Sequence, residues 1–172
     1  GSRAHGPDRA ELRRGSPLGQ LVLADAYIKW YRPQEYYDGW HGTWALDGGG
    51  SLMNQAIHSV DLLVWLMGPV AEISAMMETM THERIEVEDN AVAMLKFKSG
   101  AFGVIEASTS CWAKGGNPAT VTVCGDKGTV VIADEEIKTW DFESEEPGDS
   151  GISASIKGST EGSLGGNDPT AI

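Results

Sequence analysis

LDGGGSLMNQAIHSVDLLVWLMGP, residues 46–69, predicts a glycine turn followed by a helix over residues 51–67, with a Gly-Pro pair at its end. Apolar residues point in most directions around this helix, which indicates that it is buried. Asn54, His58 and Asp61 nevertheless share one side of it, at spacings of four and three residues. This polar stripe needs an explanation, because a buried polar group without a hydrogen bond costs about 1 to 3 kcal/mol.

Two explanations of the polar stripe remain open. In the first, the groups are satisfied internally: Asn54 bonds to the glycine-rich turn, and Asp61 accepts from a backbone amide or a nearby basic side chain. In the second, the stripe faces a cleft. Three glycines at residues 48–50 favour the cleft, because they let a ligand approach a helix N-terminus, where free N–H groups attract anions. Their spacing is not the G-x-G-x-x-G fingerprint of a dinucleotide site.

Most of the remaining sequence predicts β-strands. A period-two pattern begins at Gln20 and ends before Pro33. After the helix, strand patterns cover six ranges, 70–80, 90–98, 101–110, 119–124, 129–133 and 136–142. Short turn sequences between neighbouring ranges indicate antiparallel hairpins. We therefore expect an α+β fold: an open, mostly antiparallel β-sheet with one face covered by the helix.

Apolar residues occupy both faces of several predicted strands. In residues 91–97, one face carries Ala91, Ala93, Leu95 and Phe97, and the other carries Val92 and Met94. An apolar sheet face must contact something other than water. The helix can cover one face. The other face predicts a homo-oligomer, with packing on parts of the same protein absent from this sequence as the alternative.

Composition and length predict one domain with two polar ends. We expect a connector at residues 1–19, a substrate-binding and oligomerisation domain at residues 20–142, and a flexible Gly/Ser/acidic tail at residues 143–172. The sequence starts without Met, at Gly1, and stops at NDPTAI, where a new element could begin. These ends predict a fragment of a larger protein.

The charge and the cysteine content exclude several classes of function. With 13 basic and 25 acidic residues the net charge is −12, which repels phosphate backbones and excludes nucleic acid as a partner. No apolar run approaches the roughly 18 residues of a membrane span. Cys111 and Cys124 are too few for a disulfide framework, and His41 and His82 have no ligand spacing, so we predict no metal site. A cytoplasmic protein with reduced thiols is expected.

The aromatic, turn-rich segment at residues 33–50 is a candidate wall of a binding site. Lys29 and Arg32, just before it, are candidate contacts to a hydroxyl-rich or carboxylated substrate. Tyr37 and Trp44 are candidates for stacking on a sugar ring. Each has a structural alternative, which is ion pairing for the two basic residues and packing against the sheet for the two aromatic residues.

Three segments together resemble a known family: GTWALDGGGSLMNQAIHSVDLLVWLMGPV at residues 42–70, IEVEDNAVAMLKFKSGAFGVIEAS at 85–108 and GDKGTVVIAD at 125–134. In this order they resemble the C-terminal domain of the Gfo/Idh/MocA oxidoreductases, which include glucose-fructose oxidoreductase and inositol dehydrogenase. The resemblance implies a dihydrodipicolinate reductase-like domain. It also implies an NAD(P)-dependent enzyme whose Rossmann domain, with its usual catalytic lysine, is absent from this chain. We expect NAD or NADP in the full-length protein and no cofactor in this fragment.

The resemblance also implies roles for individual residues. His58 matches the family's histidine that handles the proton of the substrate hydroxyl, and an imidazole can take or give a proton near neutral pH. Asn54 stands where an aspartate is common. An amide cannot exchange a proton in this range, so Asn54 is assigned to substrate orientation. Asp61 is expected in a buried hydrogen-bonding role and is retained as a candidate substrate contact.

The sequence therefore predicts the substrate-binding and oligomerisation domain of a nicotinamide-dependent oxidoreductase that acts on a sugar, polyol or related hydroxy compound. Such a domain should be inactive alone. Two alternatives remain: an NAD-using glycosidase of the same family, and a non-catalytic module that only assembles subunits.

Overall fold

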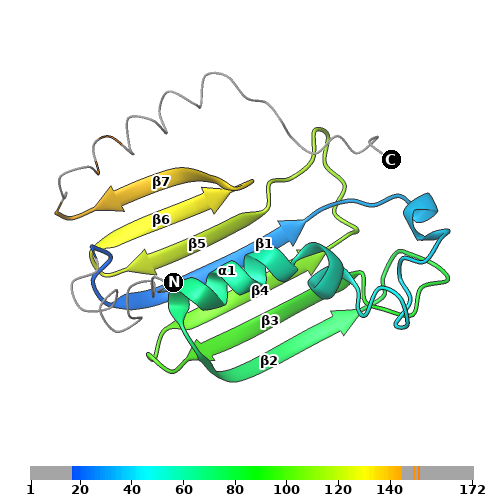
Figure 1. The fold of residues 1–172 in the computed structure, drawn as a ribbon, viewed down its shortest axis with the longest axis horizontal. Coiled ribbons are helices and arrows are strands. Elements are labelled where there is room, and N and C mark those ends of the chain that lie inside the picture. The colour runs from blue at the N-terminus through cyan, green and yellow to red at the C-terminus, as the bar shows by residue number, and fades with distance from the viewer. Residues whose placement is uncertain (1–16, 145–148, 150, 152–172) are drawn as a thin grey trace, which may run out of the picture.

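A computed structural model describes residues 17–144 together with 149 and 151, and shows a seven-stranded sheet with one helix across it (Figure 1). The strand order is β2-β3-β4-β1-β5-β6-β7. The strands are β1 (Leu21–Lys29), β2 (Val70–Glu78), β3 (Asn90–Phe97), β4 (Phe102–Ser108), β5 (Thr120–Gly125), β6 (Gly128–Ala133) and β7 (Glu136–Phe142). The helical elements are η1 (Gln34–Tyr37), η2 (Ser51–Gln55) and α1 (Ile57–Met67).

Chain connectivity explains why the sheet is mixed. The chain leaves β1, crosses the sheet through α1 and returns at the edge as β2, from which β2, β3 and β4 form an antiparallel meander. This order brings β4 beside β1 in the same direction, which makes the single parallel pair among the described strands. Strands β5, β6 and β7 form a second antiparallel meander on the other side of β1. The predicted open, mostly antiparallel α+β fold is confirmed.

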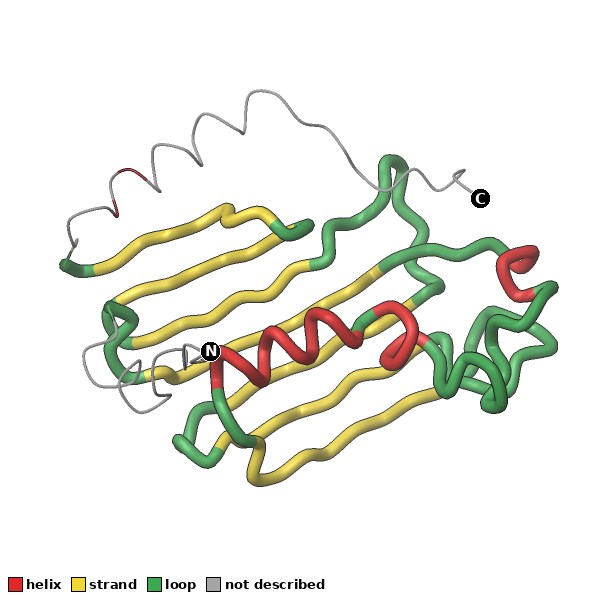
Figure 2. The backbone as a smooth tube through the Cα atoms, in the orientation of Figure 1, coloured by secondary structure: helices red, strands yellow, loops and turns green. Residues whose placement is uncertain are grey.

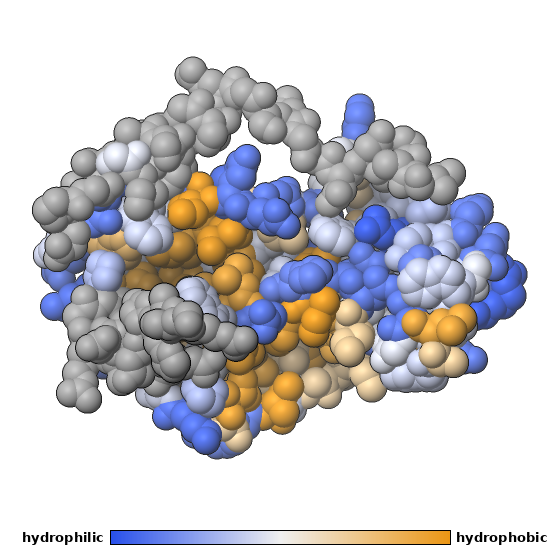
Figure 3. All heavy atoms as spheres, viewed as in Figure 1, coloured by the Kyte–Doolittle hydropathy of each residue, from blue (hydrophilic) through white to orange (hydrophobic). Residues whose placement is uncertain are grey.

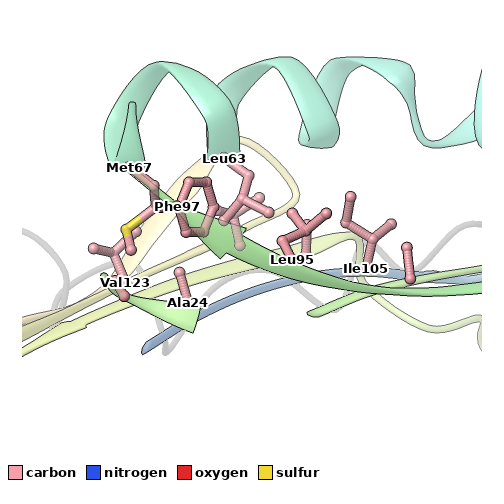
Figure 4. Close-up of a cluster of buried hydrophobic side chains, with 11 residues drawn as sticks. Ala24, Leu63, Met67, Leu95, Phe97, Ile105 and Val123 are labelled. Carbon is pink, nitrogen blue, oxygen red and sulfur yellow. The ribbon is translucent and has the colours of Figure 1, made fainter. Parts of the chain in front are cut away.

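The core lies between α1 and the sheet. Leu63 and Met67 point from the helix toward side chains of β1, β3, β4 and β5, including Ala24, Leu95, Phe97, Ile105 and Val123 (Figure 4). Small side chains let the helix approach β1, where Ala24 and Ala26 are fully buried. At β4, a side chain at Gly103 would place its Cβ 2.8 Å from the Phe97 ring. Close packing of this kind excludes larger residues at such positions.

The structure corrects the prediction of a helix buried on all sides. Within the described part of the chain, α1 packs on the sheet with one side, and the opposite side is exposed and carries His58, Asp61 and Trp65. Trp65 is 59% exposed, and Met53 and Ile57 are also open to solvent. Figure 3 shows this helix-bearing face, with apolar side chains gathered over its centre. The apolar pattern around the helix indicates a second contact surface that the described residues do not cover.

The opposite face of the sheet carries no helix among the described residues, and exposed apolar side chains lie on it beside the ion pairs Lys96–Glu72 and Lys29–Glu106. In β3 the buried residues alternate with exposed Val92 and Met94, and Met94 is 62% exposed. Cross-strand pairing places Met76 of β2 beside Val92, and Val104 of β4 beside Met94. We call this surface the open face. The prediction that several strands are apolar on both faces is confirmed.

The predicted ends of the chain remain untested. The connector at residues 1–19 and the tail at residues 143–172 lie largely outside the described residues. Among the described residues, no helix is long and apolar enough to cross a membrane.

Candidate functional site

Two loops meet the start of the helix at one end of the sheet (Figure 2). The loop at residues 33–50 follows β1, and the loop at residues 79–89 connects β2 to β3. Gln34 holds them together, because its amide donates to the carbonyl of Glu83 at 2.9 Å and accepts from the Glu83 N–H at 2.9 Å. The Gly42 carbonyl accepts from the Glu86 N–H at 2.8 Å. The aromatic loop is thus fixed by main-chain contacts to the second loop.

The glycine turn presents its N–H groups to a protein carboxylate. The buried side chain of Glu88 accepts from Gly50 N–H at 3.1 Å and Leu52 N–H at 3.0 Å, and its carbonyl accepts from Ser51 N–H at 2.9 Å. Carboxylates stabilise helix N-termini by satisfying donors that the helix leaves free. The interpretation of this turn as an anion-binding site is therefore wrong, because Glu88 occupies these N–H groups.

The helix begins with a π-turn rather than a regular α-turn. In η2, Ala56 N–H donates to the Ser51 carbonyl at 3.0 Å, an i to i−5 bond, before α1 starts at Ile57. Single π-turns occur frequently at functional sites. Asn54 lies in the π-turn and is half-buried, whereas His58 lies in the first turn of α1 and is exposed. The two predicted catalytic residues thus lie on consecutive turns, with His58 accessible.

Asn54 belongs to a polar cluster with the aromatic loop. Its amide nitrogen donates to Asp47 Oδ1 and lies 3.4 Å from His41 Nδ1. Asp47 Oδ2 accepts from Gly42 N–H at 2.8 Å. The His41 ring stacks on Tyr36, with ring centroids 4.1 Å apart. Asn54 is therefore tied to the residue that opens the glycine turn, as one of the two explanations of the polar stripe predicted.

Arg32 lies beside this cluster and is held by aromatic rings. Its guanidinium lies 5.2 Å from the Trp30 ring centroid and 5.3 Å from that of Tyr36. One terminal nitrogen donates to Gln55 Oε1 at 3.1 Å, and Gln55 in turn donates to the Tyr36 hydroxyl at 3.2 Å. Buried Arg32 Nε has no hydrogen-bond partner in the described part of the chain. Arg32 is thus a fixed cation close to Asn54 through Gln55.

Tyr37 is packed into the loop structure. Its hydroxyl lies 2.8 Å from Thr109 Oγ1, and its ring contacts His82 with centroids 4.6 Å apart. Burial raises the pKa of Tyr37 to about 12. These contacts match the packing alternative for Tyr37.

Asp89 anchors the loop between β2 and β3 from a fully buried position. Its carboxylate accepts from the N–H groups of Met80 at 2.7 Å, Thr81 at 3.0 Å and His82 at 3.0 Å. The His82 ring adds an Nδ1 contact at 2.8 Å, while its Nε2 faces the Arg32 carbonyl at 2.8 Å. Burial alone would raise the pKa of Asp89, but these donors outweigh it and hold the pKa well below its usual range.

The other predicted site residues are dispersed. Lys29 lies on the open face, where Glu106 binds its amine at 2.6 Å and raises its pKa. Trp44 is 54% exposed at the tip of the aromatic loop, with its N–H donating to Glu86. Asp61 is exposed, so its predicted buried role is wrong. The structure brings Asn54 and Arg32 together through Gln55 and leaves Lys29 on the other side of the sheet.

Sequence reasoning missed Asp47, His41 and Gln55 as parts of the site. Gln55 follows Asn54 directly, but no periodic pattern links it to Arg32. Asp47 precedes the glycine turn, and its contact with Asn54 depends on the path of that turn. Among the described residues no group of three His, Cys, Asp or Glu side chains is placed to hold a metal ion.

A family model described as the GFO/IDH/MocA C-terminal domain matches residues 10–131. This chain belongs to the GFO/IDH/MocA family. Myo-inositol 2-dehydrogenase of Thermotoga maritima is 36% identical over 107 residues, which are 60% of this chain and 31% of that protein. The family match confirms the resemblance carried by residues 42–70, 85–108 and 125–134.

Solved structures of the GFO/IDH/MocA family share the fold. The WlbA dehydrogenase of Bordetella pertussis, in complex with NADH and UDP-GlcNAcA, is 38% identical with a TM-score of 0.72 and covers 81% of this chain and 43% of its own. The WlbA dehydrogenase of Chromobacterium violaceum, also in complex with NADH and UDP-GlcNAcA, is 36% identical with a TM-score of 0.75. The match covers 86% of this chain and 43% of the WlbA chain. This chain thus spans less than half the length of these relatives.

Proposed function

We propose that this chain is the substrate-binding and subunit-contact domain of an NAD(P)-dependent oxidoreductase that oxidises a hydroxyl group of a sugar, polyol or related compound. The observation that carries the proposal is the exposed His58 one turn after Asn54, in a GFO/IDH/MocA domain whose relatives include an inositol dehydrogenase. The apolar open face is proposed as the contact between subunits.

We propose that the dinucleotide does not bind at the glycine turn of this chain. The one glycine-rich turn before a helix has its N–H groups occupied by Glu88, so it cannot cradle a pyrophosphate. We therefore assign the cofactor to the part of the full-length protein outside this chain. When bound there, the cofactor supplies the hydride acceptor.

Oxidation of an alcohol releases a proton from oxygen together with a hydride from carbon. His58 is the group we assign to accept the proton, because its side chain is open to solvent on the helix side that the sheet does not cover. Asn54 orients a hydroxyl. Arg32 is proposed as a positive charge near the substrate, a role in keeping with the acidic sugar nucleotide bound by the WlbA dehydrogenases. Trp44 and Asp61 remain proposed substrate contacts.

Replacing His58 with Ala in the full-length protein tests this function. Loss of a positioned acid-base group lowers turnover by about 10²- to 10⁴-fold. NADH affinity should stay unchanged, because we place the cofactor outside this chain, and an unchanged unfolding midpoint controls for folding of the domain that carries His58. Unchanged turnover of the correctly folded His58→Ala variant would favour the non-catalytic assembly module. Release of free sugar from glycosides, with the cofactor recycled, would favour the glycosidase.

A further inference from the structure

We propose that Asp47 is a positioning residue that fixes the amide of Asn54 with its nitrogen inward, so that Oδ1 of Asn54 accepts a hydrogen bond from a substrate hydroxyl. The inference rests on the proposed function. It adds Asp47 to the site and fixes the orientation of the Asn54 side-chain amide. It starts from the cluster formed by Asp47, Asn54 and His41 next to the π-turn.

Both oxygens of Asp47 are already used within the protein. Oδ1 accepts from Asn54 and Oδ2 accepts from Gly42 N–H at 2.8 Å. The Asp47 side chain is only 6% exposed, so substrate cannot replace either contact without opening the loop. Asp47 therefore acts through Asn54 and not on the substrate.

The chemistry of the neighbours determines which end of the Asn54 amide faces inward. An amide oxygen in this position would face the Asp47 carboxylate, and two acceptors repel each other. The nitrogen instead carries two hydrogens, one for Asp47 and one directed at His41 Nδ1, 3.4 Å away. The His41 ring is held in place by Tyr36 and Trp40, with centroids 4.1 and 3.7 Å away. The contact with Asp47 requires the nitrogen on this side, and the longer His41 contact agrees with it when His41 Nδ1 carries no hydrogen.

The outward end of the amide is then an oxygen. Among the described residues, only Gln55 Nε2 is placed to donate to Asn54 Oδ1, at 3.4 Å, a long contact for a hydrogen bond. A carbonyl oxygen accepts but cannot take up a proton near neutral pH. The arrangement therefore divides the work: Asn54 holds a hydroxyl by accepting from it, and His58 moves the proton.

Exchanging the two side chains tests this direction. An amide at position 47 has one oxygen, which cannot serve both Gly42 and Asn54, so Asp47→Asn should lower kcat by about tenfold to a hundredfold through misplacement of Asn54. Asn54→Asp alone places two carboxylates against each other and should also lose activity. The double variant D47N/N54D restores the hydrogen bond between positions 47 and 54 with the roles exchanged, and His41 then donates from Nδ1 instead of accepting. Its amide at position 47 accepts from Gly42 and donates to the carboxylate at position 54, and that carboxylate presents an acceptor outward.

The double variant in the full-length enzyme should recover most of the lost kcat. Recovery of thermal stability without recovery of kcat would overturn the proposal, since it would show that the substrate needs the amide nitrogen of Asn54. Unchanged kcat in Asp47→Asn would also overturn it. Asp38→Asn is the matched control: Asp38 belongs to the same loop, and its carboxylate pairs with the exposed Arg84, 3.3 Å away, so removing the same charge there should leave kcat unchanged.

Failure of the proposed function is distinguishable from failure of this inference. If the wild-type full-length protein oxidises no polyhydroxylated compound, the proposed function fails. The direction of the amide is then judged in this chain from the NMR signals of the Asn54 side-chain NH₂. A proton of this NH₂ that is shifted downfield in the wild type and returns to the free position in Asp47→Asn supports the inward nitrogen. An NH₂ signal that Asp47→Asn leaves unchanged contradicts it.

Discussion

At the scale of single residues, the buried carboxylate of Asp89 organises the loop between β2 and β3, which contains no regular secondary structure. It gathers three consecutive N–H groups and the His82 ring, and that ring reaches on to the carbonyl of Arg32 beside the candidate site. The position of Arg32 thus depends on a residue that lies far later in the sequence, beyond the helix and the next strand.

Asp89 should make the stability of the chain depend on pH in acid. Its pKa in the folded state lies below the ordinary value of 3.8, so its stabilising effect is fully present above about pH 4 and is lost as the pH falls further. Asp89→Asn should lower the free energy of unfolding at pH 7 by about 3 kcal/mol, because it removes one partner of a buried charged cluster. Urea unfolding between about pH 3 and about pH 7 measures both effects.

The exposed Asp141 provides the control for this measurement. Asp141→Asn should leave the acid dependence intact. If Asp89→Asn unfolds with the same steep acid dependence as the wild type, another carboxylate is responsible and the assignment to Asp89 is wrong.

Residue identity and spacing predicted His58 and Asn54, because both the polar stripe and the family resemblance depend on neighbours close in sequence. They could not predict Asp47 as the partner of Asn54. That contact joins two residues through the backbone path of a glycine turn, and helical periodicity carries no information on such a path. The same limit applies to Glu88, which reaches Gly50 from the next loop.

At the scale of elements, the sequence predicted every strand of the sheet to within about three residues and the helix over residues 51–67. The π-turn at its start was not predicted, since one extra residue in a turn barely changes an apolar pattern read over a whole helix. The exposed side of α1 was missed for a related reason: apolar residues on an exposed side of a helix look the same in sequence as core residues.

Gly50 should be the least replaceable glycine of the turn before η2. A Cβ at this position would lie 1.8 Å from the Glu88 carbonyl oxygen, so the backbone must move and the contacts to Glu88 must open. Gly50→Ala should reduce the free energy of unfolding by about 3 kcal/mol, at the upper end of overpacking effects. Denaturant titration of the chain measures this loss.

Gly48 offers a matched comparison within the same turn. Its φ of +77° strains any other residue, but a Cβ there meets open space, so Gly48→Ala should cost only about 1 kcal/mol. Equal losses for Gly48→Ala and Gly50→Ala would show that backbone strain, and not the contact to Glu88, limits this turn.

At the scale of the whole molecule, the sheet separates two apolar surfaces with different surroundings. Helix α1, which carries His58, crosses one face of the sheet (Figure 1). The open face holds exposed side chains from β2, β3 and β4. The sequence predicted two apolar faces from strand alternation. It could not predict the parallel pairing of β1 with β4, because that pairing follows from the path of the chain across the sheet and not from any strand's own pattern.

The open face should hold subunits of the full-length protein together. Met76 is 82% exposed and Met94 is 62% exposed, and a charge buried between two such surfaces is destabilising because it loses its hydration. Met94→Glu should therefore convert an oligomer into monomers while His58 and its surroundings keep their structure. Light scattering of the full-length protein measures the mass. Glu136→Lys, on β7 and exposed, changes a charge away from these methionines and should leave the mass unchanged. The proposed subunit contact is wrong if the wild-type protein is monomeric. It is also wrong if the Met94→Glu variant keeps the mass of the wild-type oligomer.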